Sequence, residues 1–180
     1  MALPATDSQR RPTPPPNSRC NVVLAVTLSS MKNLFDPATA NEVKARLATL
    51  QPDTRRQWGT MTGAQAMAHC AASLEMALGD FNPPRKFIGR VLGPLIKPLA
   101  FRDDQPMRKN SLTIDEVVVQ DDRDLEVETT RLRSVIDRFT TTGPSACTTH
   151  PHAFFGPLTP EQWSILMYKH LDHHLRQFAA

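Results

Sequence analysis

The segment from Thr159 to about Phe178 carries the strongest folding signal in this chain. Thr159 is a typical helix N-cap, Pro160 suits the first helical position, and Gln162 completes a capping box. Apolar residues then recur at helical spacing as far as Phe178. An amphipathic helix of 20 residues has a long apolar face, and that face must be buried against other elements of the protein.

Three earlier segments supply partners of the same kind. Apolar residues recur at helical spacing in each of them, and no set of strands accompanies them. The sequence therefore predicts an all-α four-helix bundle with a long connection between its second and third helices. The expected helices run from an Asp36 cap to a stop at Pro52, from near Thr62 to Leu78, and from after Asp121 or Asp122 to before Gly143.

The long connection, residues 80–110, contains five prolines. Residues 87–96 predict a short amphipathic helix inside it, broken at Pro94. Its apolar face would either form a lid on the bundle or, with the neighbouring basic residues, lie on a membrane surface. We favour the lid and expect no membrane partner. Residues 117–119 allow a brief strand, although one strand makes no sheet.

Residues 1–30 differ from the rest of the chain. They hold five of the 16 prolines and no aromatic residue, which predicts disorder over 1–19. A signal peptide is the alternative interpretation, but the basic part is broken by prolines and no clear cleavage site follows Val22–Leu28. We therefore expect 1–30 to be a disordered or mis-assigned extension, with Met31 opening a single domain over 31–180.

Charge and cysteine content narrow the class of protein. The formal net charge of +3 is too small to indicate a dedicated nucleic-acid binder. No apolar stretch is long enough to span a bilayer as a helix. The three cysteines are odd in number and have no CxxC spacing, so a disulfide framework is not expected. A reducing cytoplasm is the simplest compartment.

Two of the six histidines fall on the apolar stripe of the last predicted helix. His170 and His174 follow Trp163 by seven and eleven residues and share its face, whereas His173 falls with Lys169 on the opposite, solvated side. Residues four apart on a helix are about 5–6 Å apart, so two imidazoles there can reach one metal ion. Two core histidines, each satisfied by a carbonyl or carboxylate, are the alternative.

His69 lies in the middle of the second predicted helix, among small residues and without a charged neighbour on its face. Alone it would be read as a core histidine with a hydrogen-bond partner. Each buried imidazole needs a partner for its ring nitrogens. If three histidines point inward from two helices of one bundle, one shared site is a simpler way to satisfy them than three separate sets of hydrogen-bond partners. The metal-ligand candidates are therefore His69, His170 and His174.

Three further residues are candidates for contact with a ligand or with substrate. Glu128 lies on the inner side of the third predicted helix, where it could orient an imidazole; an ion pair with arginine is the favoured alternative. His150 and His152 precede the last helix in a loop that could approach the mouth of the bundle. A structural or solvated role is the favoured reading of both.

Several motifs resemble a known superfamily. Residues 58–62 (WGTMT), followed by 67–70 (MAHC), resemble the helix-histidine opening of DinB-like proteins. Residues 155–163 (FGPLTPEQW) and 168–178 (YKHLDHHLRQF) resemble the C-terminal signature of the DUF1569-type branch. The resemblance covers roughly residues 31–178. It implies a DinB/YfiT-like bundle with a divalent-metal site whose ligands are His69, His170 and His174.

The resemblance also implies a class of chemistry. Characterised DinB-like relatives include metal-dependent thiol transferases and isomerases that use bacillithiol, mycothiol or glutathione, whereas the DUF1569-type branch brings no established activity. We expect a divalent ion (Zn, Ni or Fe), a small-molecule substrate with a low-molecular-weight thiol as the leading class, and no nucleic-acid partner. The sequence leaves open whether the protein forms a homodimer. A non-catalytic metal-binding bundle is the alternative to an enzyme.

Overall fold

The computed structural model describes residues 31–111 and 113–180, and over these ranges the chain is helical. The expected extension 1–30 lies outside the described residues. One isolated bridge, between His152 and Gly156, is the only β-type pairing in the described part. The prediction of an all-α protein is confirmed. The elements are α2 (Pro37–Leu47), α3 (Gly63–Leu78), α4 (Phe87–Ala100), η1 (Asp115–Val117), α5 (Leu125–Thr142), η2 (Gly143–Ala146) and α6 (Pro160–Gln177).

Local capping sets most of the helix starts. Thr159 and Thr62 each form a capping box with the glutamine three residues later, at the starts of α6 and α3. The Asp36 carboxylate accepts hydrogen bonds from two backbone N–H groups of α2. The third predicted helix begins later than expected, because Asp124 rather than Asp121 or Asp122 supplies the N-cap of α5.

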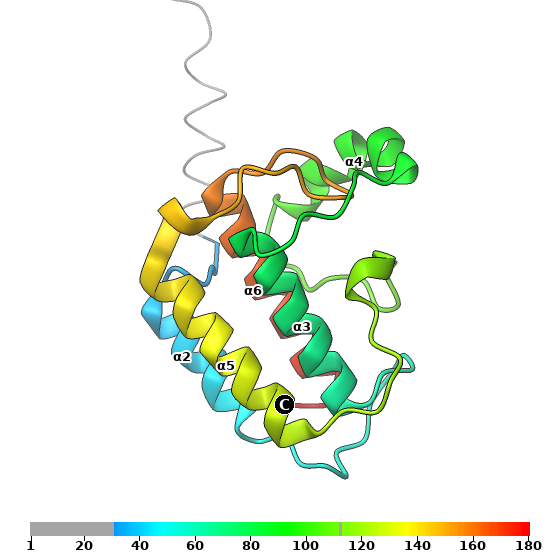
Figure 1. The fold of residues 1–180 in the computed structure, drawn as a ribbon, viewed down its shortest axis with the longest axis vertical. Coiled ribbons are helices and arrows are strands. Elements are labelled where there is room, and N and C mark those ends of the chain that lie inside the picture. The colour runs from blue at the N-terminus through cyan, green and yellow to red at the C-terminus, as the bar shows by residue number, and fades with distance from the viewer. Residues whose placement is uncertain (1–30, 112) are drawn as a thin grey trace, which may run out of the picture.

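Helices α2, α3, α5 and α6 lie side by side and enclose the hydrophobic core (Figure 1). Trp163 of α6 and Phe139 of α5 are among the largest fully buried side chains of that core. Alanine recurs along the buried part of α3, and these small side chains let α5 and α6 pack closely on both sides of it. This packing places the middle of α3 opposite the C-terminal half of α6.

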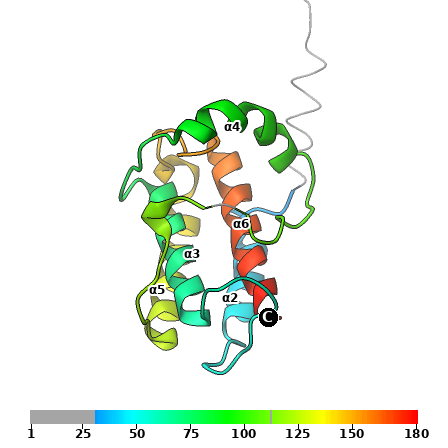
Figure 2. The same cartoon turned by 90° about the vertical axis from the view of Figure 1, so that its right-hand side faces the viewer.

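Helix α4 lies across one end of the other helices (Figure 2). It continues through Pro94 and Pro98, so the predicted break at Pro94 is wrong. Both prolines are exposed, and water can bond the carbonyls that lose their helical partner. Its large apolar side chains also face away from the protein, so α4 is not the expected apolar lid. None of the described helices is both long and apolar enough to cross a bilayer.

The segment Val117–Val119 forms no strand. Residues Asp115–Val117 make the short helix η1 instead, and Val117 is buried against α3. The β-branched residues that suggest a strand are used here to cover the bundle rather than to pair with another strand.

Candidate metal centre

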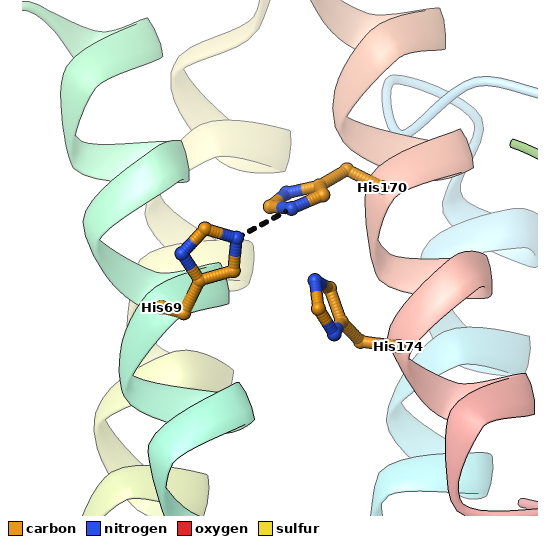
Figure 3. A group of neighbouring side chains, drawn as sticks. All are labelled: His69, His170 and His174. Carbon is orange, nitrogen blue, oxygen red and sulfur yellow. Dashed lines mark hydrogen bonds between the residues drawn. The ribbon is translucent and has the colours of Figure 1, made fainter. Parts of the chain in front are cut away.

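Three histidines from two helices meet inside the protein. His69 of α3 faces His170 and His174 of α6, and the three rings point toward one another (Figure 3). One ring nitrogen from each lies within 4.8 Å of the other two, a group that could hold a metal ion. His69 and His174 are buried and His170 is half-buried. The structure thus brings together the three residues that the helical pattern selects.

A backbone carbonyl sets the proton position on His69. Its Nδ1 lies 2.7 Å from the carbonyl oxygen of Val117 in η1. That oxygen can only accept a hydrogen bond, so Nδ1 must carry the proton. A neutral ring then leaves the lone pair on Nε2, which faces His170. The turn that replaces the expected strand therefore prepares one imidazole as a ligand.

A glutamine fixes the position of the proton on His174 in a similar way. We call its two hydrogen bonds, to Trp58 and to His174, the Gln177 relay. The side-chain amide of Gln177 donates from Nε2 to the carbonyl oxygen of Trp58, at 2.8 Å. This contact fixes the orientation of the amide, so its Oε1 accepts from His174 Nδ1, also at 2.8 Å. The free lone pair of His174 is consequently on Nε2. Gly59 leaves space for the relay, because a Cβ there would lie 2.6 Å from the Gln177 amide nitrogen.

The sequence interpretation missed these supporting residues. Gln177 follows His174 by three residues, a spacing that places both on one helix face and could have identified it as a partner. Trp58 and Gly59 are part of the motif that suggested the family, but nothing in their spacing shows that they support a histidine on α6. The same holds for Val117.

His170 completes the group and is held by His69. The two Nε2 atoms are 2.9 Å apart. Because His69 Nε2 carries a lone pair, His170 Nε2 must be the donor in this structure. The shared proton stands between two nitrogens at the position where a cation would bind both. A metal ion could take the place of that proton if His170 carried its proton on Nδ1 instead of Nε2, which leaves the ring neutral.

Burial keeps the three imidazoles neutral. It is the main cause that lowers the pKa of His69, that lowers the pKa of His170 well below its ordinary value, and that lowers the pKa of His174 to about 3. Charge on the neighbouring imidazoles lowers the pKa values of His170 and His174 further. Neutral imidazole is the form that binds metals, so at neutral pH His69 and His174 direct a free Nε2 lone pair inward, whereas His170 must first move its proton from Nε2 to Nδ1.

The spacing and chemistry of the donors fit a first-row divalent ion. Ligands of one tetrahedral ion lie about 3.4 Å apart when each bond is about 2.1 Å. The ligand atoms of the group lie within 4.8 Å of one another, so the longest separation would have to shorten by up to about 1.4 Å through side-chain rotation. Three imidazoles suit Zn, Ni or Fe and leave at least one coordination position open.

The other site candidates lie outside this group. Glu128 is buried and its carboxylate pairs with Arg123 at 3.0 Å and with Arg131 at 3.3 Å, as the favoured reading expected. His150 bonds the carbonyl of Pro83. His152 accepts the backbone N–H groups of two phenylalanines at Nδ1, and its ring packs 5.3 Å from that of Trp163.

The opposite face of α6 is solvated at Arg176 but covered at two other positions. His173 and Lys169, expected in water, are only 8 % exposed. The chain after α4 covers them, and the Lys169 ammonium donates to the carbonyls of Ala100 and Asp103. The His173 ring packs 5.6 Å from that of Trp58. His173 nevertheless stays outside the three-histidine group, as its place on the helix predicts.

Comparison with known proteins identifies the family but not an activity. No curated protein and no solved structure matches the chain. One family model matches residues 30–180, which is most of the chain, and its description is "Protein of unknown function (DUF1569)". The match spans every helix that carries or supports the three histidines. The chain therefore belongs to the DUF1569 family.

Proposed function

We propose that this protein binds one divalent metal ion through His69, His170 and His174, in a bundle of the DinB/YfiT-like type. The observation that carries the proposal is that His69 and His174 are each held in one tautomer by a hydrogen bond. The Val117 carbonyl and the Gln177 amide each hold a proton on Nδ1 and so direct an Nε2 lone pair inward. Outer partners of this kind are typical of histidines that bind metals. The motif resemblance to DinB-like proteins supports the same ligand set.

The leading activity is transfer of a low-molecular-weight thiol to a small electrophile. A divalent ion in this position would lower the pKa of a thiol or a water bound at its open position. In the reaction, the thiol sulfur forms a bond to an electrophilic carbon, the leaving group departs with its electron pair, and the thiol proton passes to solvent. His170 is half-buried and is the most exposed of the three residues, so a small molecule would have to approach the group from its side.

A non-catalytic metal site is the second candidate, and one observation favours it. Two open surface hollows, with volumes of about 430 and 460 Å³, lie beside residues 52–63 with Phe178 and beside residues 124–130. Neither includes a histidine of the group. An enzyme for small molecules commonly binds its substrate in a pocket that contains the reactive groups. A structural ion would need no such pocket.

Metal analysis of protein purified without a histidine tag tests the site. We expect near-stoichiometric divalent metal in the wild type, because three neutral donors converge. Separate changes of His69, His170 and His174 to Ala should each abolish it. His150→Ala is the matched control, because His150 is also partly buried but bonds the Pro83 carbonyl outside the group. His173→Ala should likewise retain the metal. Full occupancy in both His170→Ala and His174→Ala would refute the ligand set.

A second assay separates the two candidate functions. Metal-loaded protein is mixed with glutathione, bacillithiol or mycothiol and an electrophilic aryl halide, and the thioether is quantified. An enzyme should form product above the uncatalysed rate, and His174→Ala should abolish the excess while His150→Ala keeps it. Stoichiometric metal together with no excess product, across the thiols and several electrophiles, would favour the structural site.

A further inference from the structure

Helix α4 exposes an unusual amount of apolar surface. Leu95 is 70 % exposed and Phe87 is 81 % exposed, and five more large apolar side chains of the helix face outward with them. Clusters of this size on a protein surface generally mark a place where something binds. We call this cluster the α4 patch, and it consists of Phe87, Ile88, Val91, Leu92, Leu95, Ile96 and Leu99.

Two glycines explain why these side chains point outward. Gly89 and Gly93, one turn apart, are the buried residues of α4. A Cβ at Gly89 would lie 2.6 Å from the Phe154 Cα, and one at Gly93 would lie 2.4 Å from the Phe154 carbonyl oxygen. The helix therefore rests on the backbone of the loop before α6 through its glycine face. No rotation of α4 can bury the patch while this contact is kept.

Basic residues accompany the patch. Residues 81–102 contain five Lys or Arg side chains and no Asp or Glu. Lys86 and Arg102 are paired with acidic residues, whereas Arg85, Arg90 and Lys97 form no ion pair among the described residues. Arg85 and Lys97 donate to the carbonyls of Gly89 and Pro157, so the exposed Arg90 is the cation of the three most available to an anionic partner. Arg90 and Lys97, seven residues apart, lie on one side of α4 at the border between the glycine face and the patch.

We propose that the α4 patch docks onto the surface of a membrane that contains anionic lipids. The helix has 14 residues, about 21 Å, so it is too short to span a bilayer but long enough to lie in its interface. An apolar face bordered by basic side chains is the pattern of interfacial helices, because lipid chains take the apolar residues and anionic headgroups pair with the cations. Two copies of α4 packed together would instead bring like charges close.

Co-sedimentation of the full chain with lipid vesicles tests the proposal. We expect binding to vesicles of phosphatidylcholine mixed with phosphatidylserine, weaker binding at high salt, and little binding to phosphatidylcholine alone. Leu95→Glu should abolish binding, since a charge enters the centre of the patch. Val127→Glu is the matched control, because Val127 is also an exposed apolar residue, at 62 %, but lies on α5. Arg90→Gln should weaken binding about fivefold, which corresponds to about 1 kcal/mol per basic residue.

Two results would overturn this assignment. Equal sedimentation of the wild type and Leu95→Glu would show that the patch does not contact lipid. Failure of the wild type to sediment with the anionic vesicles would also overturn it. A concentration-dependent dimer in size-exclusion chromatography that Leu95→Glu dissociates would then assign the patch to a second copy of the chain. Metal content, measured on the same samples, is independent of α4, so failure here leaves the proposed metal site unaffected.

Discussion

Gln177→Met is the sharpest test of how the three histidines are held. Methionine keeps the length of the glutamine side chain but removes two hydrogen bonds of 2.8 Å, to His174 Nδ1 and to the Trp58 carbonyl. The His174 imidazole is then free to turn its lone pair away. Loss of such an outer partner lowers metal affinity about 10- to 100-fold, or about 1.4–2.7 kcal/mol. The orphaned buried groups should also lower the free energy of unfolding by about 1–3 kcal/mol.

Gln177→Glu separates these two effects. A carboxylate still accepts the proton of His174 Nδ1, and a carboxylate partner makes the ligating imidazole more basic. The Glu variant should therefore bind zinc at least as tightly as the wild type. The ionised carboxylate has no proton for the Trp58 carbonyl, so the loop before α3 should be held less firmly.

The assay is competition for zinc against a chromophoric chelator at neutral pH, combined with thermal melts of metal-free protein. Gln162→Met is a control on the same helix: it removes the half of the α6 capping box in which the Gln162 side chain accepts from the Thr159 backbone N–H, and it should cost about 1 kcal/mol of stability without changing zinc affinity. If Gln177→Met binds zinc as tightly as the wild type, the hydrogen bond from His174 Nδ1 to Gln177 does not direct the His174 lone pair toward the metal. The proposed role of the fixed tautomers would then be wrong.

Three further predictions follow from individual contacts. Gly89→Ala should lower stability by about 1–3 kcal/mol in chemical denaturation, because its Cβ would collide with the Phe154 backbone; an unchanged midpoint would mean that α4 is not seated there. Burial lowers the pKa of His152 to about 4, so its contribution is complete above pH 6.5 and falls by up to about 3 kcal/mol as the pH drops toward 4. Urea melts across this range should show a shallower pH slope for His152→Phe, and equal slopes would contradict the burial argument. Glu128→Gln should keep the metal and lose about 1 kcal/mol of stability, since its partners are two arginines; loss of metal would instead show that this carboxylate supports the site.

The sequence predicted those parts of the fold that depend on local signals. The Thr159 cap with Gln162 three residues later predicted the start of α6, and that box forms between neighbours in the chain. The start of α3 was expected near Thr62, where the structure shows a second box that the sequence interpretation did not identify. The same periodicity places His170 and His174 on one face with Trp163, and His69 meets them as expected. The ligand set itself stays a prediction until metal is measured.

Contacts between distant segments account for what the sequence did not predict. Lys169 and His173 were predicted to be solvated, but in the structure the segment after α4 covers them. Residues 100–110 show no helical or strand periodicity, so the sequence did not indicate that this segment packs on α6. An amphipathic helix is expected to bury its large apolar side chains, but α4 exposes them and buries two glycines instead. The glycines allow the helix backbone to approach the neighbouring loop more closely than any large side chain would. Neither effect has a local signature.

The three imidazoles are carried by helices, but irregular segments determine which of their nitrogens are free. The Val117 carbonyl belongs to η1, and the Trp58 carbonyl belongs to the loop before α3. Without those contacts two buried N–H groups would lack partners, and rotation of either ring would remove its lone pair from the centre. Metal affinity should therefore follow the folding of these connections as closely as the folding of the helices. The same dependence applies to a catalytic site and to a structural one, because both require Nε2 of His69 and His174 to face the ion.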